Sequence, residues 1–136
     1  MKYIKILTIL TLIFNSLILI GAGHGFGPLF LFEALIFTPN YVNESEINLI
    51  GTYDQKIIPF AFFSIIFQIV LIISLFAKNT VKKNLIIISL ILLLSNLLYF
   101  TFDFTESSLS TFSLISAIPF IVTALILFVK NLFRNE

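Results

Sequence analysis

The sequence predicts an all-α integral membrane protein, a four-transmembrane-helix bundle with a short interfacial or re-entrant helix in the first extracytoplasmic loop. Composition is the first reason, because 59% of the 136 residues are hydrophobic and only 11% are charged. Soluble domains carry about 25% charged residues, so a chain this short cannot cover a buried core with a polar surface. The other two reasons are four long apolar runs and the position of the basic residues between them.

Each apolar run is long enough to cross a bilayer as a helix. At about 1.5 Å per residue, a helix of about 20 residues crosses a hydrocarbon core of about 30 Å. Only a helix satisfies its own backbone groups within such a segment. Apart from Lys5 the runs contain no charged residue, and they are Ile4–Gly23, Ile57–Ala77, Leu85–Phe102 and Leu109–Val129. Residues 1–136 are therefore expected to form a single membrane domain, with an outer loop over residues 24–56.

The first run has an alternative interpretation as a signal peptide. Lys2 and Lys5 resemble the basic start of such a peptide, and Gly21-Ala22-Gly23 resembles a small-residue cleavage site. Signal peptides have apolar stretches of about 7–15 residues, and this stretch is longer. We therefore expect it to remain as a helix.

The basic residues predict the orientation. If the chain crosses four times, seven of its eight basic residues fall on one side, and Lys56 falls on the other. Basic residues accumulate on the cytoplasmic side of membrane proteins. The sequence therefore predicts a multi-pass protein of the cell (cytoplasmic) membrane with cytoplasmic N- and C-termini. Abundant Ile, Phe, Asn and Lys suggest an AT-rich genome and a bacterial source.

The rare residue types exclude several chemistries. The chain has no cysteine, which excludes disulfides, Cys-ligated zinc and iron–sulfur clusters. Its single histidine, His24, excludes bis-histidine haem ligation within one chain and an HExxH zinc site. No cofactor is expected. A formal net charge of +1 gives no reason to expect nucleic acid as a partner.

The loop after the first run has internal structure of its own. Four glycines surround His24, and Pro28 then suits the first turn of a new helix. Leu29–Phe37 is apolar except for Glu33 and Ala34 and is too short to span, so it predicts an interfacial or re-entrant helix that Thr38-Pro39-Asn40 ends. The polar stretch Asn43–Asn48 is expected to be a solvated loop, and Ile47–Tyr53 could be a short strand or coil.

Isolated polar residues recur at helical spacing within the runs and predict the interior of the bundle. Asn15, Gln68 and Asn96 each lie about eleven residues from a helix end, close to the membrane midplane. With Tyr99 and Thr123 they form a candidate intramembrane polar layer. Interhelical hydrogen bonding is the favoured role over a ligand or ion pathway, because nothing in the layer ionises at neutral pH. Pro119 is expected to kink the fourth run, where Ser116 can satisfy a freed backbone group.

Ionisable residues gather instead at the outer boundary. His24 with Glu33, Asp103 and Glu106 could hold a divalent cation. The same residues could supply a general acid and base, if burial raises the pKa of a carboxyl. His24 also suits a capping role, and Asp103 and Glu106 suit a solvated loop. Glu33 is the hardest to explain structurally, because a lone carboxylate on an apolar helix is costly in lipid; His24 is its expected partner.

We therefore expect a non-enzymatic membrane protein that binds a partner protein as an accessory subunit or protective factor. The expected partners are the lipid bilayer and either a membrane protein or a second copy of the chain. The alternative is an enzyme or cation-binding protein, with candidate catalytic residues His24, Glu33, Asp103 and Glu106 and candidate metal ligands His24, Glu33 and Asp103. Transport is less favoured, since the runs show neither a discontinuous span nor a buried charge.

Overall fold

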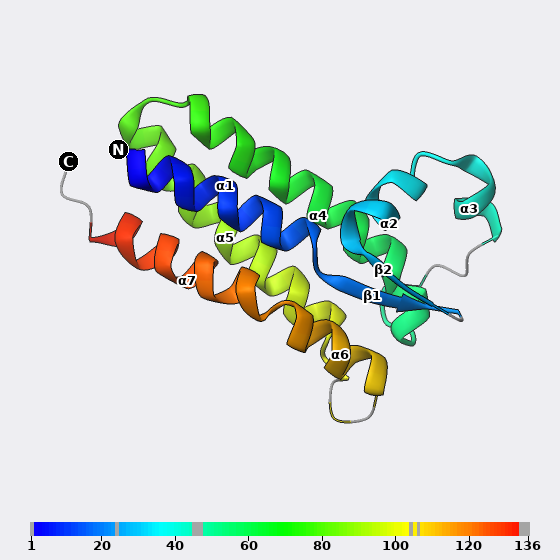
Figure 1. The fold of residues 1–136 in the computed structure, drawn as a ribbon. Helices are drawn as coiled ribbons and strands as arrows, with labels where there is room; N and C mark the ends of the chain where they lie inside the picture. The colour runs from blue at the N-terminus through cyan, green and yellow to red at the C-terminus, as the bar shows by residue number, and fades with distance from the viewer. Residues whose placement is uncertain (1, 24, 45–47, 104, 106, 134–136) are drawn as a thin grey trace.

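The computed structural model describes residues 2–23, 25–44, 48–103, 105 and 107–133. The described chain is mostly helical, with one small antiparallel sheet near its start (Figure 1). Its elements are α1 (Lys2–Ser16), β1 (Leu19–Ala22), β2 (Gly25–Pro28), α2 (Leu29–Leu35), α3 (Pro39–Glu44), α4 (Tyr53–Phe76), α5 (Asn79–Phe100), α6 (Ser108–Ser116) and α7 (Ile118–Leu132).

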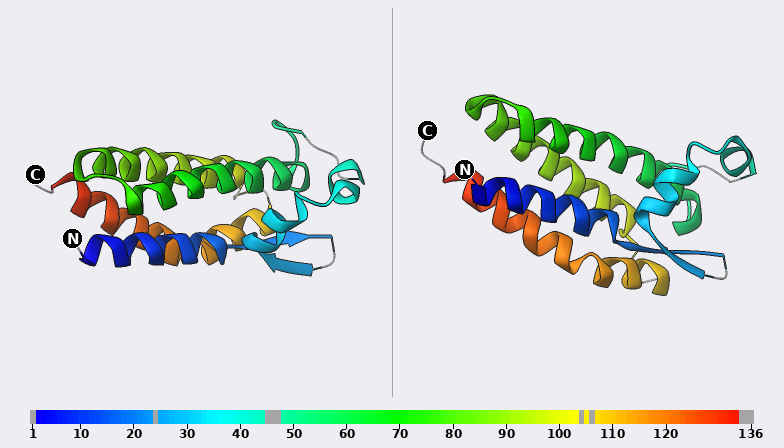
Figure 2. Two further views of the ribbon diagram at one scale, coloured as in Figure 1. Left: turned by 90° about the horizontal axis from the view of Figure 1, so that it is seen from above. Right: turned by 45° about the horizontal axis from the view of Figure 1, so that its top comes forward.

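The long helices form a bundle. α4 and α5 pack side by side as an antiparallel pair, α1 packs against α7, and α7 also packs against α5. The start of α1, the α4–α5 turn and the end of α7 lie at one end, which we name the terminal end (Figures 1 and 2). The sheet, α2 and α3 lie at the other end, which we name the hairpin end.

Two of the described helices, α4 and α5, are long and apolar enough to cross a membrane. α6 and α7 would make a third crossing if the pair forms one span, and the two helices meet at a bend of 49°. α1 has 15 residues, a length of about 22 Å, which is less than a full crossing. The structure therefore agrees with a helical membrane protein, and the expected count of four spans depends on α1 and on the bent pair.

The helix expected over Ile4–Gly23 ends at Ser16 instead. Leu19–Ala22 turns into strand β1 and pairs with β2, so that Leu19 lies opposite Pro28 and Ala22 lies opposite Gly25. Gly23 follows β1 with a φ of +56°, a conformation that glycine adopts without steric cost. Glycine also has a low helix propensity, so the glycine-rich end of the apolar run favours a hairpin over a continuation of the helix.

The loop contains the expected short helix and one unexpected helix. α2 begins directly after Pro28 and ends at Leu35, and the Thr38 backbone N–H donates to the Leu35 carbonyl. α3 was not expected, because we took its polar residues for the start of a solvated loop. The described residues 48–52 form turns rather than a strand.

The kink expected at Pro119 is confirmed. α6 ends at Ser116, and α7 starts at Ile118 with Pro119 in its first turn. Proline lacks the N–H that would continue the helical hydrogen bonds, so the bend follows from its covalent structure.

The core lies along the contacts of α4, α5 and α7 with their neighbours. Phe60 and Phe100 stack at 4.3 Å between ring centroids, and Phe120 is fully buried. Hydroxyl groups are buried at helix contacts and bond back to their own helices, as Thr8 does to the Ile4 carbonyl at 2.7 Å. The polar residues within the apolar runs are expected to face the interior of the bundle. Five of them are fully buried, as expected: Thr8, Thr11, Ser64, Ser89 and Ser113.

Candidate functional site

Glu33 and Asp103 are the described carboxylates that the sequence singles out, and each of them binds a different side chain. Glu33 on α2 accepts a hydrogen bond from Gln68, and Asp103 pairs with Lys56. Lys56 and Gln68 are twelve residues apart on α4, about 18 Å along the helix. The structure therefore does not bring these two carboxylates into one site. His24 and Glu106, the other two candidates, lie outside the described residues.

Glu33 is held by an amide that the sequence did not identify as its partner. Gln68 Nε2 lies 2.6 Å from Glu33 Oε1. Burial raises the pKa of Glu33 from 4.5 to about 7, and the hydrogen bond from Gln68 opposes that rise. Ionised Glu33 accepts from the amide nitrogen, whereas neutral Glu33 can donate to the amide oxygen after the amide rotates. The pair therefore accommodates both protonation states near neutral pH.

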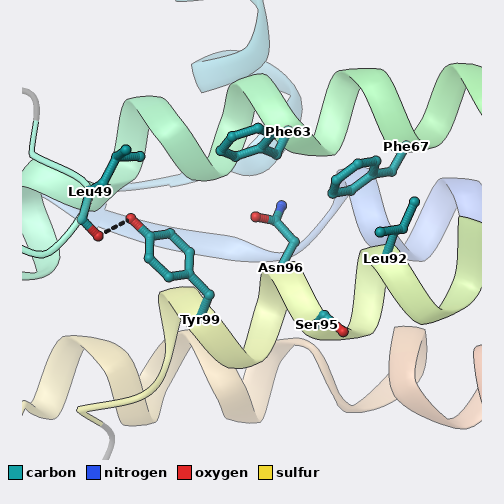
Figure 3. Close-up of a pocket in the computed structure, with 7 residues that line it drawn as sticks. All are labelled: Leu49, Phe63, Phe67, Leu92, Ser95, Asn96 and Tyr99. Atoms are coloured by element: carbon teal, nitrogen blue, oxygen red, sulfur yellow. Dashed lines mark hydrogen bonds between the residues drawn. The ribbon is translucent and has the colours of Figure 1, made fainter.

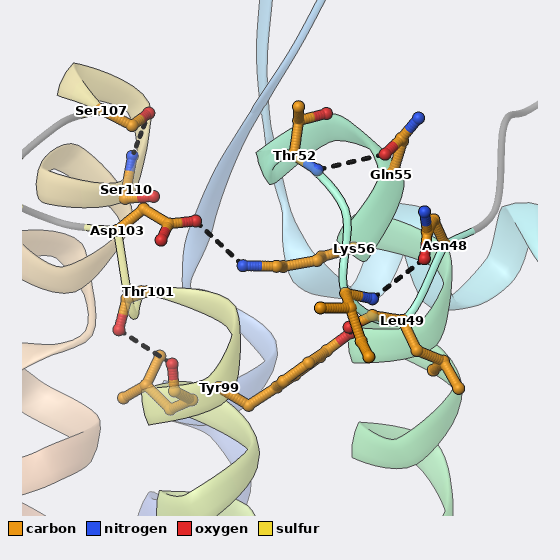
Figure 4. Close-up of polar contacts among 12 residues, drawn as sticks. Asn48, Leu49, Thr52, Gln55, Lys56, Tyr99, Thr101, Asp103, Ser107 and Ser110 are labelled. Atoms are coloured by element: carbon orange, nitrogen blue, oxygen red, sulfur yellow. Dashed lines mark hydrogen bonds and ion pairs between the residues drawn. The ribbon is translucent and has the colours of Figure 1, made fainter.

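Lys56 is the one basic residue that the sequence places on the opposite side from the other seven. In the structure its charge is paired with that of Asp103. Its side chain is buried, with Nζ 2.9 Å from Asp103 Oδ2 and 5.7 Å from the centre of the Tyr99 ring. A buried ammonium needs a charged partner, and Asp103 supplies it from the residues that follow α5 (Figure 4). Asp103 is thus a structural counter-ion for Lys56 rather than a purely solvated loop acid.

The turn before α4 is fixed beside this ion pair. Thr52 and Gln55 form a capping box at the start of α4, in which the Gln55 side chain accepts from the Thr52 N–H at 3.1 Å. The Leu49 carbonyl accepts a 2.6 Å bond from the Tyr99 hydroxyl, which ties the turn to α5 (Figure 4). Tyr99 is expected in the intramembrane polar layer. Instead, its hydroxyl holds the turn before α4 against the bundle.

Strand β1 has its outer edge covered by side chains, which sequence reasoning missed. The Gly21 N–H donates to the Tyr53 hydroxyl at 3.2 Å, and the Leu19 N–H donates to the Ser116 hydroxyl at 2.9 Å. An exposed strand edge would leave such N–H groups unsatisfied in lipid. Ser116, expected to serve the kink, bonds to strand β1 and to the Ser113 carbonyl of its own helix. The apolar stretch gave no sign that its backbone would need these partners.

The remaining members of the predicted polar layer bond to different neighbours. Asn96 Nδ2 donates to the Phe60 carbonyl and to Ser64 Oγ, each at 3.0 Å, and so joins α5 to α4. Thr123 bonds to carbonyls of its own helix. Asn15 is buried, and its Nδ2 has no hydrogen-bond partner within the described part of the chain. Asn96 and Gln68 thus act as links between pairs of elements.

Two hollows follow the seam between α4 and α5. The first, of about 350 Å³, is a mainly apolar groove along the two helices (Figure 3). The second, of about 420 Å³, lies at the hairpin end and contains Lys56 and Asp103. Leu49 and Tyr99 line both, so the hollows adjoin. A third hollow, of about 410 Å³, lies between the hairpin, α3 and the start of α4, and includes Tyr41 and Asp54.

Within the part of the chain that the structure describes, no three acidic or histidine side chains come close enough together to hold a metal ion. Comparisons with protein families, with curated proteins and with solved structures find no match. Any functional assignment therefore depends on the geometry of the site.

Proposed function

We propose that the chain is a four-span protein of the cytoplasmic membrane that binds a partner protein through its hairpin end. The spans would be α1 extended by the hairpin, α4, α5 and the α6–α7 pair, with both chain ends in the cytoplasm. The basic residues support this orientation, because those at the start of α1, at the α4–α5 turn and the start of α5, and in the last turn of α7 all lie at the terminal end (Figure 1).

The observation that carries the partner-binding role is the exposed apolar surface of the hairpin end. Phe26, Phe37 and Ile50 are 59%, 75% and 94% exposed, and they lie on the hairpin, after α2 and before α4. Large exposed apolar surfaces commonly mark interaction sites. Lys56 and Asp103 nearby pair with each other, so we assign recognition of the partner protein to the apolar side chains.

The test is recovery of a stoichiometric partner after extraction in mild detergent. We expect a different protein to co-purify with the wild-type chain and to be lost from the Phe37→Ser, Ile50→Ser double variant. Phe76→Ser is the matched control, because Phe76 is 85% exposed at the terminal end of α4 and should retain the partner. Purification as a lone monomer with turnover, or as copies of the chain alone, would overturn the proposal.

A second candidate function, an enzyme or cation-binding protein, is favoured by Glu33, which lies beside Gln68 within α4 rather than at the extracytoplasmic mouth. A carboxyl with a pKa of about 7 is suited to proton transfer at neutral pH. The proposed site would use Glu33 and His24. It would not use Asp103, which already neutralises Lys56. Calorimetric titration with Zn²⁺ or Mn²⁺ tests the cation-binding form; heat that Glu33→Gln does not remove would exclude Glu33 as a ligand.

A further inference from the structure

The groove and the adjoining hollow form one continuous track along the seam between α4 and α5. The track is apolar in the groove and charged in the hollow. Its groove is bordered by Phe63 and Phe67 on α4 and by Leu92 on α5, at the level of the spanning helices (Figure 3). The adjoining hollow begins at Tyr99 and reaches Asp103. Leu92 and Asp103 are eleven residues apart in the chain, about 16 Å at helical rise. The track is therefore apolar over about half its length and charged at one end.

The apolar part suits a hydrocarbon chain. Phe63 is 37% exposed, and the seam opens on the outer surface of the α4–α5 pair. Around helices that cross a membrane, this surface faces lipid chains. Asn96 directs its amide nitrogen toward α4, where it bonds to Phe60 and Ser64, and Figure 3 shows its oxygen on the side of Tyr99. The wall of the groove thus becomes polar toward the charged hollow.

The charged part suits a headgroup that carries both signs. Lys56 Nζ has three N–H donors, one of which is given to Asp103 Oδ2. Asp103 is 37% exposed at its side chain, so its carboxylate is accessible from the hollow. A phosphate beside Lys56 and an ammonium beside Asp103 would each meet the opposite charge. A headgroup with phosphate alone would meet the repulsion of Asp103 as well as the attraction of Lys56.

We propose that this track binds one phospholipid with a primary-amine headgroup, such as phosphatidylethanolamine, with an acyl chain between Phe63, Phe67 and Leu92 and the headgroup at Lys56 and Asp103. A primary ammonium donates N–H bonds to a carboxylate, whereas a trimethylated one has no N–H to donate. The site requires α4 and α5 to cross a membrane. Ile50 lines the headgroup hollow, so this part of the site adjoins the proposed partner-binding residues, whereas the groove is lined by neither Phe37 nor Ile50.

The test uses the full chain in a mild detergent and four added lipids with identical acyl chains. These are phosphatidylethanolamine, its N-monomethyl derivative, phosphatidylcholine and phosphatidylglycerol. Native mass spectrometry measures the lipid retained per chain, and thermal unfolding measures the shift in Tm. We expect one retained phosphatidylethanolamine and a Tm shift that decreases with N-methylation and is small for phosphatidylglycerol, because a ligand that binds the folded state more tightly stabilises it more.

Two tryptophan variants test the location. Ser95 lines the groove, so Ser95→Trp should fill it and weaken retention by about tenfold or more. Leu98 is 65% exposed, lies one turn further along α5 and does not line the groove, so Leu98→Trp should retain the lipid. Equal Tm shifts for all four lipids, a preference for phosphatidylglycerol or retention by Ser95→Trp would overturn the proposal. None of these outcomes depends on whether Phe37→Ser, Ile50→Ser loses its partner.

Discussion

The phenolic oxygen of Tyr53 lies 2.6 Å from the hydroxyl oxygen of Ser113, and this contact joins the start of α4 to α6. The same phenolic oxygen accepts the Gly21 N–H from β1. One buried hydroxyl therefore connects three segments that are far apart in sequence. Because each group would otherwise be buried without a partner, the contact stabilises the hairpin end.

Tyr53→Phe should destabilise the fold by about 1–3 kcal/mol, because it leaves the Gly21 N–H and the Ser113 hydroxyl without their shared partner. Tyr3→Phe is the control, since Tyr3 is 76% exposed and should unfold as the wild type does. Unfolding in detergent micelles, followed by circular dichroism, measures the difference. Equal stability of the two variants would show that the Tyr53 hydroxyl is dispensable.

Stability should fall as pH rises from about 4.5 to about 7, because burial raises the pKa of Glu33 from 4.5 to about 7. Across that interval the folded state binds more protons at Glu33 than the unfolded state, so raising the pH favours unfolding. Among the described residues of α1, β2 and α4, which pack on α2, the charged groups are Lys2, Lys5, Asp54 and Lys56. None of these appears among the causes of the Glu33 shift.

Glu33→Gln should remove this pH dependence and raise stability at pH 8, since a neutral amide can still bond to Gln68. Thermal unfolding of both proteins at several pH values from about 4 to about 8, a range chosen to bracket the transition, is the measurement. A wild-type slope that survives in Glu33→Gln would assign the effect to another group.

Asp103→Asn should destabilise the protein by about 1–3 kcal/mol, because it leaves the buried Lys56 ammonium without its counter-ion. Lys56→Met combined with Asp103→Asn should recover part of that loss, since an apolar side chain of similar length can occupy the buried position. A double-mutant cycle measured by thermal unfolding gives the coupling between the two side chains. Additive effects would contradict a direct interaction.

The proposed topology can be tested with single cysteines, because the chain contains none of its own. A membrane-impermeant thiol reagent should label Ile50→Cys in intact cells, since Ile50 is 94% exposed at the hairpin end. Asn79→Cys, at the α4–α5 turn, should be labelled only after the cells are opened. Labelling of both positions in intact cells, or the reverse pattern, would contradict the proposed orientation.

The sequence predicted the helical class, the helix α2 and the kink at Pro119, because these follow from local composition and from covalent structure. It did not predict β1, since an apolar stretch reads equally well as a helix or as a buried strand when its backbone partners are distant. The partners of β1 are Tyr53 and Ser116, and no local pattern joins them to residues 19–22.

The site was predicted less fully for the same reason. Glu33 was a candidate because a carboxylate is rare in an apolar helix and costly to bury. Its pKa, which burial raises, agrees with that cost. Gln68 and Lys56 were not assigned as partners, because a long-range contact between a helix and a loop residue depends on packing that one sequence does not reveal. The charge of Lys56 was visible, but its burial was not.

The covered edge of β1 also constrains the order in which the protein assembles. Residues 19–28 are synthesised early, whereas Ser113 and Ser116 follow about ninety residues later in the chain. Until Ser116 arrives, the N–H group of Leu19 lacks its native acceptor, and lipid offers none, whereas the acceptor of Gly21, Tyr53, follows 32 residues after it. The outer edge of β1 is therefore complete only once α6 lies beside it, so that Leu19 depends on a partner 97 residues further along the chain.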